Sequence, residues 1–151
     1  MVKILLAVDG SENSDKAVSK VAEVASSKAA EINLITVIED INISKKDSTT
    51  TPSPRKIKKI RKQREKQREL EAEGESILNE AEKILNEENL EAKKVMVNGN
   101  APDKICEYAE EKEIDLIALA DKGRGGIKKI LLGSTSEKVL RNANSPVLVI
   151  K

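Results

Sequence analysis

The sequence has no histidine, no tryptophan and no phenylalanine among its 151 residues, and Tyr108 is its only aromatic residue. Without imidazole there is neither histidine acid–base catalysis nor a histidine-ligated metal site. One aromatic ring cannot form the platform of several rings on which single-stranded nucleic acids stack their bases. These absences exclude a large part of enzyme chemistry and one common mode of nucleic-acid binding.

Cysteine is nearly absent as well, because Cys106 is the only one. A single cysteine cannot form an internal disulfide, and the N-terminal MVKILLAVDG contains neither a secretory signal nor a long apolar run. We therefore predict a protein of the reducing cytoplasm. Cys106 precedes the acid Glu107 rather than a positive group, so we predict a small packed residue with no chemical role.

Neither sign of charge dominates the chain. Lys and Arg number 27, Asp and Glu number 26, and the formal net charge is +1 although 35% of the residues are charged. A chain balanced in this way has no overall field that would attract nucleic acid or a membrane. Its length of 151 residues is typical of one domain, and we predict a single domain over residues 1–151.

Short apolar runs alternate along the chain with segments of helical periodicity. Such runs are typical of parallel strands that are covered on both faces. The predicted strands are residues 3–9, 31–38, 91–97, 114–120 and 146–150. The first helix follows Gly10, with Ser11, Asn13 and Ser14 as alternative N-caps and with Ala17, Val18, Val21, Ala22, Val24 and Ala25 at helical spacing. Later helices are predicted over residues 101–112 and 134–142.

Five strands joined through helices predict an α/β fold, with a five-stranded parallel sheet that is doubly wound and carries helices on both faces. Ligands of such sheets bind beyond the carboxyl ends of the strands, where the strand order reverses. We therefore expect the site among residues 9–11, 37–43, 97–99 and 120–136.

The last of these segments is rich in glycine. It contains Gly123, Gly125, Gly126 and Gly133, and Ser134-Thr135-Ser136 follows directly at the start of a predicted helix. Glycines allow backbone amides to approach an anion closely, and the amides of a helix N-terminus bind phosphate. The same pattern also suits plain turns followed by a serine cap, and spacing alone leaves both interpretations open.

The middle of the chain separates its charges. After a Ser-, Thr- and Pro-rich loop over residues 42–54, a long helix is predicted over residues 55–88. The basic arm, which begins at Arg55 and ends at Arg68 (residues 55–68), holds nine basic residues and one acid, for a net charge of +8. The acidic segment (residues 69–91) holds nine acids and one base, for a net charge of −8. Both signs oppose the helix macrodipole, so the pattern does not serve the stability of an isolated helix.

Apolar residues are distributed as unevenly as the charges. A helical apolar face begins at Leu70 and continues through Gly74, Ile77, Leu78, Ala81, Ile84 and Leu85, whereas residues 61–69 contain no apolar residue. We therefore predict that the acidic segment packs on the sheet and that the basic arm projects from the domain, as a charged insertion at residues 42–69.

The sequence resembles the universal stress protein family in the segments KILLAVDGSENS, ITVIED, AEEKEIDLIALA and ILLGSTSEKVLRNANSPVLVIK. Nucleotide-binding members carry the motif G-x2-G-x9-G-[ST] between the fourth strand and the last helix. Gly123, nine further residues and Gly133-Ser134 match its second half, whereas Ala120 occupies the position of the first glycine. The resemblance implies a Rossmann-like sheet of the adenine nucleotide alpha hydrolase type.

The resemblance also implies a ligand and a site. The ligand is ATP, with ADP or AMP as alternatives, acting as a regulatory signal in the stress response. The implied binding residues are Asp9 and Val37 beside the adenosine, Ala7, Ala120 and Lys122 along the site, and Gly123, Gly133, Ser134, Thr135 and Ser136 at the phosphates. Mg²⁺ would accompany a triphosphate, with Asp9 and Asp121 at strand ends as candidate carboxylates. No residue is placed as a general base, so we expect no catalytic residue and slow or absent hydrolysis.

The resemblance further implies a homodimer that pairs through the last predicted strand, from Pro146 to Ile150. Ala120 favours an alternative, a dimeric interaction module that binds no nucleotide and contacts a protein or nucleic acid through the basic arm. Three interpretations of the basic arm stay open. It is a solvated arm, or it contacts nucleotide phosphates, an acidic protein or the acidic half of a partner subunit, or it binds nucleic acid through its charge.

Overall fold

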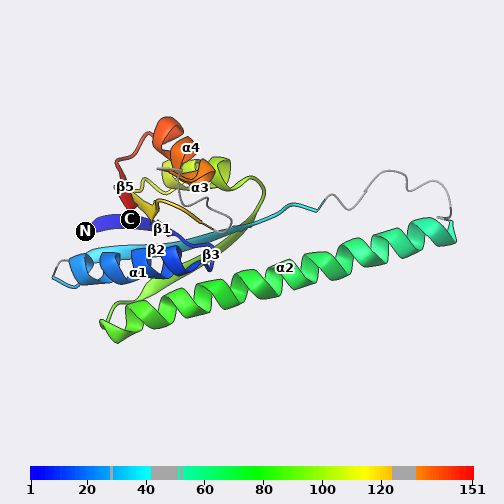
Figure 1. The fold of residues 1–151 in the computed structure, drawn as a ribbon, viewed down its shortest axis with the longest axis horizontal. Coiled ribbons are helices and arrows are strands. Elements are labelled where there is room, and N and C mark those ends of the chain that lie inside the picture. Colours follow the sequence, from blue (N-terminus) through cyan, green and yellow to red (C-terminus); the bar gives the residue numbers. More distant parts are fainter. Residues whose placement is uncertain (28, 42–50, 52, 124–131) are drawn as a thin grey trace.

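The computed structural model describes residues 1–27, 29–41, 51, 53–123 and 132–151. Its elements follow in the order β1 (Val2–Ala7), α1 (Glu12–Ala25), β2 (Ala30–Ile38), α2 (Pro54–Glu87), β3 (Ala92–Asn98), α3 (Ala101–Glu111), β4 (Leu116–Ala120), α4 (Ser134–Asn142) and β5 (Val147–Ile150). The predicted strands and helices are all present (Figure 1), with small differences at their ends. Within the described residues, no helix combines the length and the apolar character needed to cross a bilayer.

The start of β4 shows why the boundaries differ. The prediction began this strand at Ile114, but the observed strand begins at Leu116. Glu113 has a positive φ of 53°, and the Ile114 N–H donates to the Ala109 carbonyl at 2.9 Å. These contacts cap the C-terminus of α3, so Ile114 belongs to the helix cap and not to the strand.

The sheet is parallel throughout and has the strand order β3-β2-β1-β4-β5. Leu6 in the central strand lies opposite Leu34 of β2 on one side and Ala118 of β4 on the other. The chain runs outward from β1 through β2 to β3, and then returns to the other side of β1 for β4 and β5. This is the predicted doubly wound sheet, and its strand order reverses between β1 and β4.

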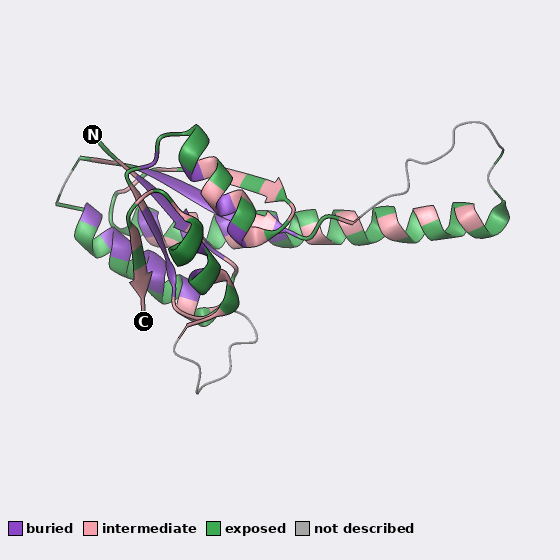
Figure 2. Cartoon of the chain, turned by 90° about the horizontal axis from the view of Figure 1, so that it is seen from above, coloured by how far each residue is buried: buried purple, intermediate pink, exposed green. Residues whose placement is uncertain are grey.

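The core has two halves, one on each face of the sheet. Leu6 packs with α1 and α2 on one face, and its neighbour Leu5 packs with α3 and α4 on the other, because successive residues of a strand point to opposite faces. Figure 1 shows the helices on the two faces of the sheet, and in Figure 2 the buried residues follow the strands and the inner helix faces. Val24 was predicted at helical spacing with the α1 face, but it is 58% exposed because it lies off the buried stripe. Cys106 is half-buried at the edge of the second half, as a packed residue should be.

Helix α2 joins the domain through half of its length. Its buried residues are Gly74, Leu78, Ala81 and Leu85, all from the acidic segment, and they face β2 and β3. A Cβ at Gly74 would lie 2.7 Å from Met96 Sδ and 3.0 Å from Ile38 Cγ2, so the bare helix backbone contacts the sheet there. The N-terminal half extends past the sheet, as predicted (Figures 1 and 2).

We expect Gly74→Val to lower the free energy of unfolding by about 1–3 kcal/mol, because the added side chain must displace Met96 and Ile38. Ala72→Val is the control for a valine on the exposed face of the same helix. Ala→Val lowers helix propensity whereas Gly→Val raises it, so propensity alone would make Gly74→Val the more stable variant. Urea unfolding of both variants measures the difference. A midpoint for Gly74→Val no lower than that of the unaltered protein would show that close packing at Gly74 contributes nothing.

Candidate functional site

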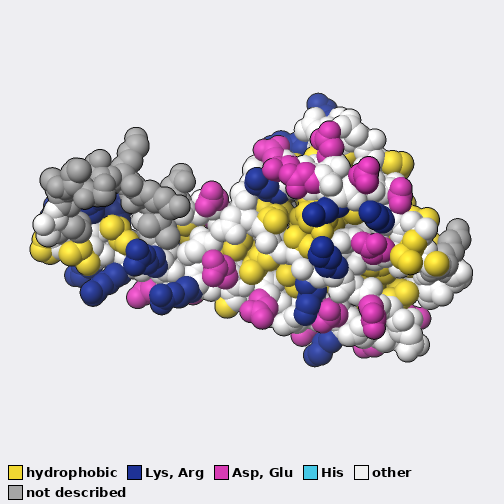
Figure 3. Space-filling model, turned by 180° about the vertical axis from the view of Figure 1, so that it is seen from behind, with side chains coloured by type: hydrophobic (Ala, Val, Ile, Leu, Met, Phe, Trp, Pro, Cys, Tyr) yellow, Lys and Arg dark blue, Asp and Glu magenta, His cyan; other side chains and the backbone are white. Residues whose placement is uncertain are grey.

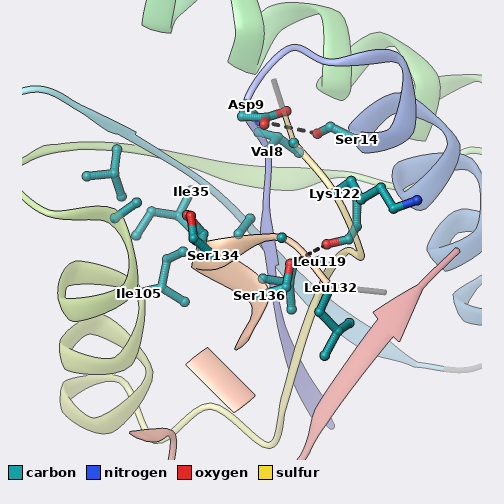
Figure 4. A pocket seen from close by; sticks show the side chains of 17 residues that line it. Val8, Asp9, Ser14, Ile35, Ile105, Leu119, Lys122, Leu132, Ser134 and Ser136 are labelled. Carbon is teal, nitrogen blue, oxygen red and sulfur yellow. Dashed lines mark hydrogen bonds between the residues drawn. The ribbon is translucent and has the colours of Figure 1, made fainter. Parts of the chain in front are cut away.

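A cavity of about 370 Å³ opens at the point where the strand order reverses. The carboxyl ends of β1 and β4 form its two sides, β2 contributes to its base, and the first turns of α3 and α4 face it. Figure 4 shows these side chains around the hollow. The cavity thus lies where ligands of doubly wound sheets bind.

All ten residues predicted for the site line this cavity, namely Ala7, Asp9, Val37, Ala120, Lys122, Gly123, Gly133, Ser134, Thr135 and Ser136. The remaining lining residues were not predicted, and they are Val8, Ser14, Ile35, Ala101, Ile105, Leu119 and Leu132. Of the segments predicted around the site, residues 97–99 do not line the cavity. Residues 42, 43 and 124–131 lie outside the described part of the chain.

The turn after β1 holds a carboxylate at the mouth of the cavity. Asp9 Oδ1 accepts a hydrogen bond from the Ser11 N–H at 2.9 Å, and the Asp9 N–H donates to Ser14 Oγ at 3.2 Å. Ser11 is the N-cap of α1, since its Oγ accepts from the Ser14 N–H at 3.1 Å. Gly10, with φ of 79°, provides the turn between them. The first helix of the chain therefore begins in a network that also fixes Asp9.

Two glycines allow the chain to pass close to fixed groups. A Cβ on Gly123 would collide with Asp9 Oδ2, so only glycine lets the segment after β4 approach that carboxylate. A Cβ on Gly133 would lie 3.1 Å from the Asp121 carbonyl oxygen, and the Gly133 N–H donates to the same oxygen. Gly133 has an ordinary φ of −70°, so close approach rather than backbone conformation favours glycine here. These contacts fix the N-terminus of α4 against the end of β4.

The first turn of α4 presents amides and hydroxyls to the cavity. Gly133 is the N-cap, and Ser134, Thr135 and Ser136 follow as lining residues. Amides in the first turn of a helix have no acceptor within the helix, and they carry the positive end of its dipole. Lys122 lines the cavity too, but Figure 4 shows its ammonium group extending away from Ser134. The positive character at this end of the cavity therefore comes mainly from backbone amides.

Ser136 has a structural partner. It is 4% exposed, and its Oγ donates to the Ala120 carbonyl oxygen at 2.6 Å. The hydroxyl hydrogen thus joins α4 to the last residue of β4. Among the three hydroxyl residues predicted at the phosphates, Ser136 is the one that positions the helix.

Ala120 is compatible with the backbone at the first position of the glycine motif. It is the last residue of β4 and lies opposite Ile150 in the sheet. Among the described residues, non-glycine residues with positive φ are Asn89 and Glu113, so Ala120 has a conformation that any residue adopts. Its side chain, 8% exposed, joins the apolar wall of the cavity.

Another part of the cavity lining is aliphatic. It consists of Ile35 and Val37 from β2, Ile105 from α3 and Leu119 from β4. Strand alternation could have found Ile35, because residues two apart point to the same face. Helical spacing could have found Ala101 and Ile105, which lie four apart at the start of α3. The cavity therefore combines an apolar slot with an anion-binding end and one carboxylate among its described lining residues.

The described residues contain no group of three or more Cys, Asp or Glu side chains that could together hold a metal ion. Burial raises the pKa of the Cys106 thiol, with a smaller contribution from the negative charge of Asp103. That thiol lies outside the cavity lining.

The cavity combines aliphatic side chains with the first-turn amides of α4. It can therefore bind a molecule that has an apolar part and an anionic end.

Comparison of the sequence with known proteins gives one family. The sequence model of the universal stress protein family matches residues 1–151. Universal stress protein YxiE of Bacillus subtilis is 30% identical over 151 residues, which cover 99% of this chain and 98% of YxiE. Universal stress protein MJ0577 of Methanocaldococcus jannaschii is 31% identical over 99% of this chain and 94% of its own length.

Solved structures agree with the sequence comparison. The structure of MJ0577 has a TM-score of 0.79 to this fold, with 30% identity over 99% of this chain and 95% of that one. A universal stress protein from Archaeoglobus fulgidus in complex with dAMP has a TM-score of 0.65 at 21% identity, and it covers 100% of this chain and 98% of that one. An Arabidopsis thaliana family member with AMP bound has a TM-score of 0.67 at 20% identity, with 100% and 92% covered. The last two show likeness of fold.

We expect Ser136→Ala to lower the free energy of unfolding by about 1–2 kcal/mol, because it leaves the buried Ala120 carbonyl without this donor. Ser134→Ala is the control, since Ser134 is exposed two positions earlier on the same helix turn. Chemical unfolding of the two variants gives the comparison. A loss of stability in Ser134→Ala as large as that in Ser136→Ala would contradict the positioning role.

Proposed function

The chain belongs to the universal stress protein family, and on that premise we propose that its cavity binds an adenine nucleotide, with ATP as the expected ligand. The proposal rests on one observation. A single cavity contains both a group of aliphatic side chains and the N-terminus of α4, which Gly123 and Gly133 adjoin. Family members with bound AMP and dAMP support the class of ligand. A role in the stress response comes from the family as a whole.

Each part of the cavity suits one part of the nucleotide. The adenine would lie against Ile35, Val37 and Ile105, where aliphatic side chains take the place of an aromatic stack. Asp9 would face the adenosine. The amides from Ser134 to Ser136 would receive the phosphates, since helix N-termini bind phosphate, and Gly123 and Gly133 would let the backbone approach them. Mg²⁺ would be held chiefly by the phosphates, because Asp121 lies outside the cavity lining.

We propose that the nucleotide is a regulatory ligand and is not consumed. Asp9 is the carboxylate of the described lining, and its Oδ1 already accepts from the Ser11 N–H. A residue held in this way suits recognition of the ligand better than activation of water. Cytoplasmic location likewise stays a prediction from the scarcity of cysteine.

The alternative is an interaction module of the same family that binds no nucleotide. Ala120 at the first motif position is the feature that favours it. The strand conformation of Ala120 weakens this argument, because the backbone there does not need glycine. Mass spectrometry of protein purified without added nucleotide distinguishes the two and identifies ATP, ADP or AMP.

We expect calorimetry to detect ATP binding in the presence of Mg²⁺, and Gly133→Val to weaken it at least about tenfold, equivalent to about 1.4 kcal/mol. The added side chain would press on the Asp121 carbonyl and move the start of α4. Ala72→Val, on the exposed face of α2, should leave the affinity unchanged. Unchanged affinity in Gly133→Val, or no binding by the unaltered protein at millimolar ATP, would reject the site.

We further propose that two chains pair through β5, which is an edge strand of the sheet. The N–H groups of Ile117 and Asp121 donate to the carbonyls of Pro146 and Ile150, at 2.9 and 2.8 Å. The N–H and C=O of one strand residue point to the same side, so those of Val147 and Val149 face the open edge. An open edge of this kind is a template for pairing with another strand.

At about 500 mM ionic strength, where contacts between charged surfaces are screened, Val149→Pro should convert the dimer to monomers, because proline removes an N–H from the open edge and leaves the β4–β5 hydrogen bonds intact. Val149→Thr keeps both the N–H and the β-branched shape, and it should remain dimeric. Sedimentation velocity gives the oligomeric state, and circular dichroism checks the fold. A dimer that survives Val149→Pro at this ionic strength places the interface elsewhere.

A further inference from the structure

The basic arm of α2 is a concentrated charge that the proposed nucleotide site does not use. Its side chains are largely exposed, and the half of α2 that carries them extends beyond the sheet. Figure 3 shows dark-blue Lys and Arg side chains gathered on this part of the molecule, at the left of the view. The cavity of the candidate site is lined by residues of other elements.

Within the described part of the chain, few acidic residues lie close enough to neutralise the positive charge of the basic arm. None of its nine Lys and Arg side chains takes part in an ion pair within the described residues. Glu39 and Asp40 lie near it, where they line a hollow with Lys59, Lys62 and Lys66. Even if both acids are counted against the arm, its net charge of +8 falls only to +6.

A helix with this charge order gains stability from an anionic neighbour. Positive charge at its N-terminus and negative charge at its C-terminus both oppose the macrodipole. Lys58, Lys62 and Lys66 repel one another at i,i+4 spacing. The arm is also without the apolar face that would hold it on the domain.

The acidic segment of the same helix presents the complementary surface. Its buried stripe of Gly74, Leu78, Ala81 and Leu85 faces the sheet. The opposite stripe, at spacings of three, four and seven residues, consists of Glu69, Ala72, Ser76 and Lys83, all exposed. Glu75, Glu80 and Glu87 flank it and are exposed as well. Glu80 has a cation 3.7 Å away at Lys83, in a pair that is largely solvated and therefore weak.

The electrostatics of the neighbouring helix agree with a negative surface. Burial raises the pKa of Asp15 on α1, and the next largest cause is the negative charge of Glu80, followed by Asp9 and Glu12. A basic group placed over Glu80 would relieve this repulsion. The outer surface formed by α1 and the acidic segment therefore favours a positively charged partner.

We propose that the basic arm docks on the acidic segment of a second copy of this chain, with the two α2 helices antiparallel. The sign of the charge changes between Arg68 and Glu69, near the middle of a helix that spans Pro54–Glu87. A two-fold axis close to this point places each arm beside the other chain's acidic segment at the same time. Such a contact is isologous and closes on itself.

The shape of α2 permits this pairing. The helix has 34 residues, which corresponds to a length of about 50 Å, so the contact can be long. In this arrangement each domain would lie on the inner face of its own helix, at the opposite end of the pair from the other domain. Ala72 and Ser76 are small and lie near the centre of the outer stripe, where the two helices must approach to about 8–10 Å.

The observations favour a second copy over nucleic acid. The arm's charge of +8 is matched by −8 on the adjoining segment, and the whole chain has a net charge of only +1. A nucleic acid bound to the arm would be repelled by the acidic segment that continues the same helix. The lone aromatic residue cannot add base stacking, since the Tyr108 hydroxyl donates to Asn33 Oδ1 at 3.2 Å inside the domain.

The first test is the salt dependence of association in Val149→Pro, in which pairing through β5 is removed. Sedimentation equilibrium should show a dimer at about 50 mM ionic strength, and about 500 mM should weaken it at least about tenfold, because screening shortens the reach of charges. A monomer at low salt overturns the proposal. Retention of the monomer on DNA or RNA at low salt would then assign the arm to nucleic acid.

A charge exchange in the same background gives the sharper test. One variant lowers the net charge of the arm from +8 to +2 with Lys58→Glu, Arg61→Glu and Lys62→Glu. The other reduces the net charge of the acidic segment from −8 to −2 with Glu75→Lys, Glu80→Lys and Glu87→Lys. Each variant alone should associate more weakly than the parent, because both halves of the contact lose most of their attraction. A 1:1 mixture should form a heterodimer, because one half of that contact pairs the unaltered arm with the unaltered acidic segment.

All six positions are exposed, so we expect both variants to fold, with circular dichroism as the check. Association of either variant alone as tightly as the parent overturns the proposal, and so does a mixture that stays monomeric. ATP affinity is measured in parallel and should be unchanged. Its loss would count against the proposed function without touching this inference, because the two surfaces share no residue.

Discussion

The reversal of strand order between β1 and β4 determines the position of every part of the candidate site. Both strands pair with each other through Leu5 and Ile117, but their connections leave in opposite directions, toward α1 and toward α4. The two following turns therefore separate and leave a cavity above their carboxyl ends. The chain then returns α4 to this point, where Gly133 bonds to the carbonyl of Asp121. An aliphatic slot and a helix N-terminus come together as a result.

In the glycine-rich segment, packing contacts explain which positions of the motif need glycine. Gly123 is required because Asp9 Oδ2 occupies the place of a side chain, and Gly133 because the Asp121 carbonyl lies beside it. Ala120, in contrast, lies within a strand, where a methyl group is accommodated. Ser136 connects the two ends of the segment through the Ala120 carbonyl. The motif thus holds α4 in place, and the proposed nucleotide site depends on that placement.

Much of this arrangement could be predicted from the sequence, because apolar runs such as LIALA and helical stripes such as that of α2 depend on local periodicity. The lining residues predicted through family resemblance also lie together on one cavity. Local periodicity gives the face of β2 that holds Ile35 and the face of α3 that holds Ala101 and Ile105. That these faces meet at the cavity depends on how β2 and α3 pack, so the three residues were missed. The direction of the Lys122 side chain likewise could not be predicted from the sequence. The projection of the basic arm was predicted because the apolar face of the long helix begins at Leu70, but the contact of Gly74 with Met96 required the packed structure.

The charged half of α2 and the cavity are two separate features of one small domain, and the central claim concerns the cavity. The most direct measurement is a titration of the ¹⁵N-labelled protein with ATP and Mg²⁺, followed through the amide resonances. The account predicts saturable shifts at Gly123, Gly133 and the amides from Ser134 to Ser136, with the basic arm unaffected. Shifts confined to the arm, or no shifts at millimolar ATP, would contradict it.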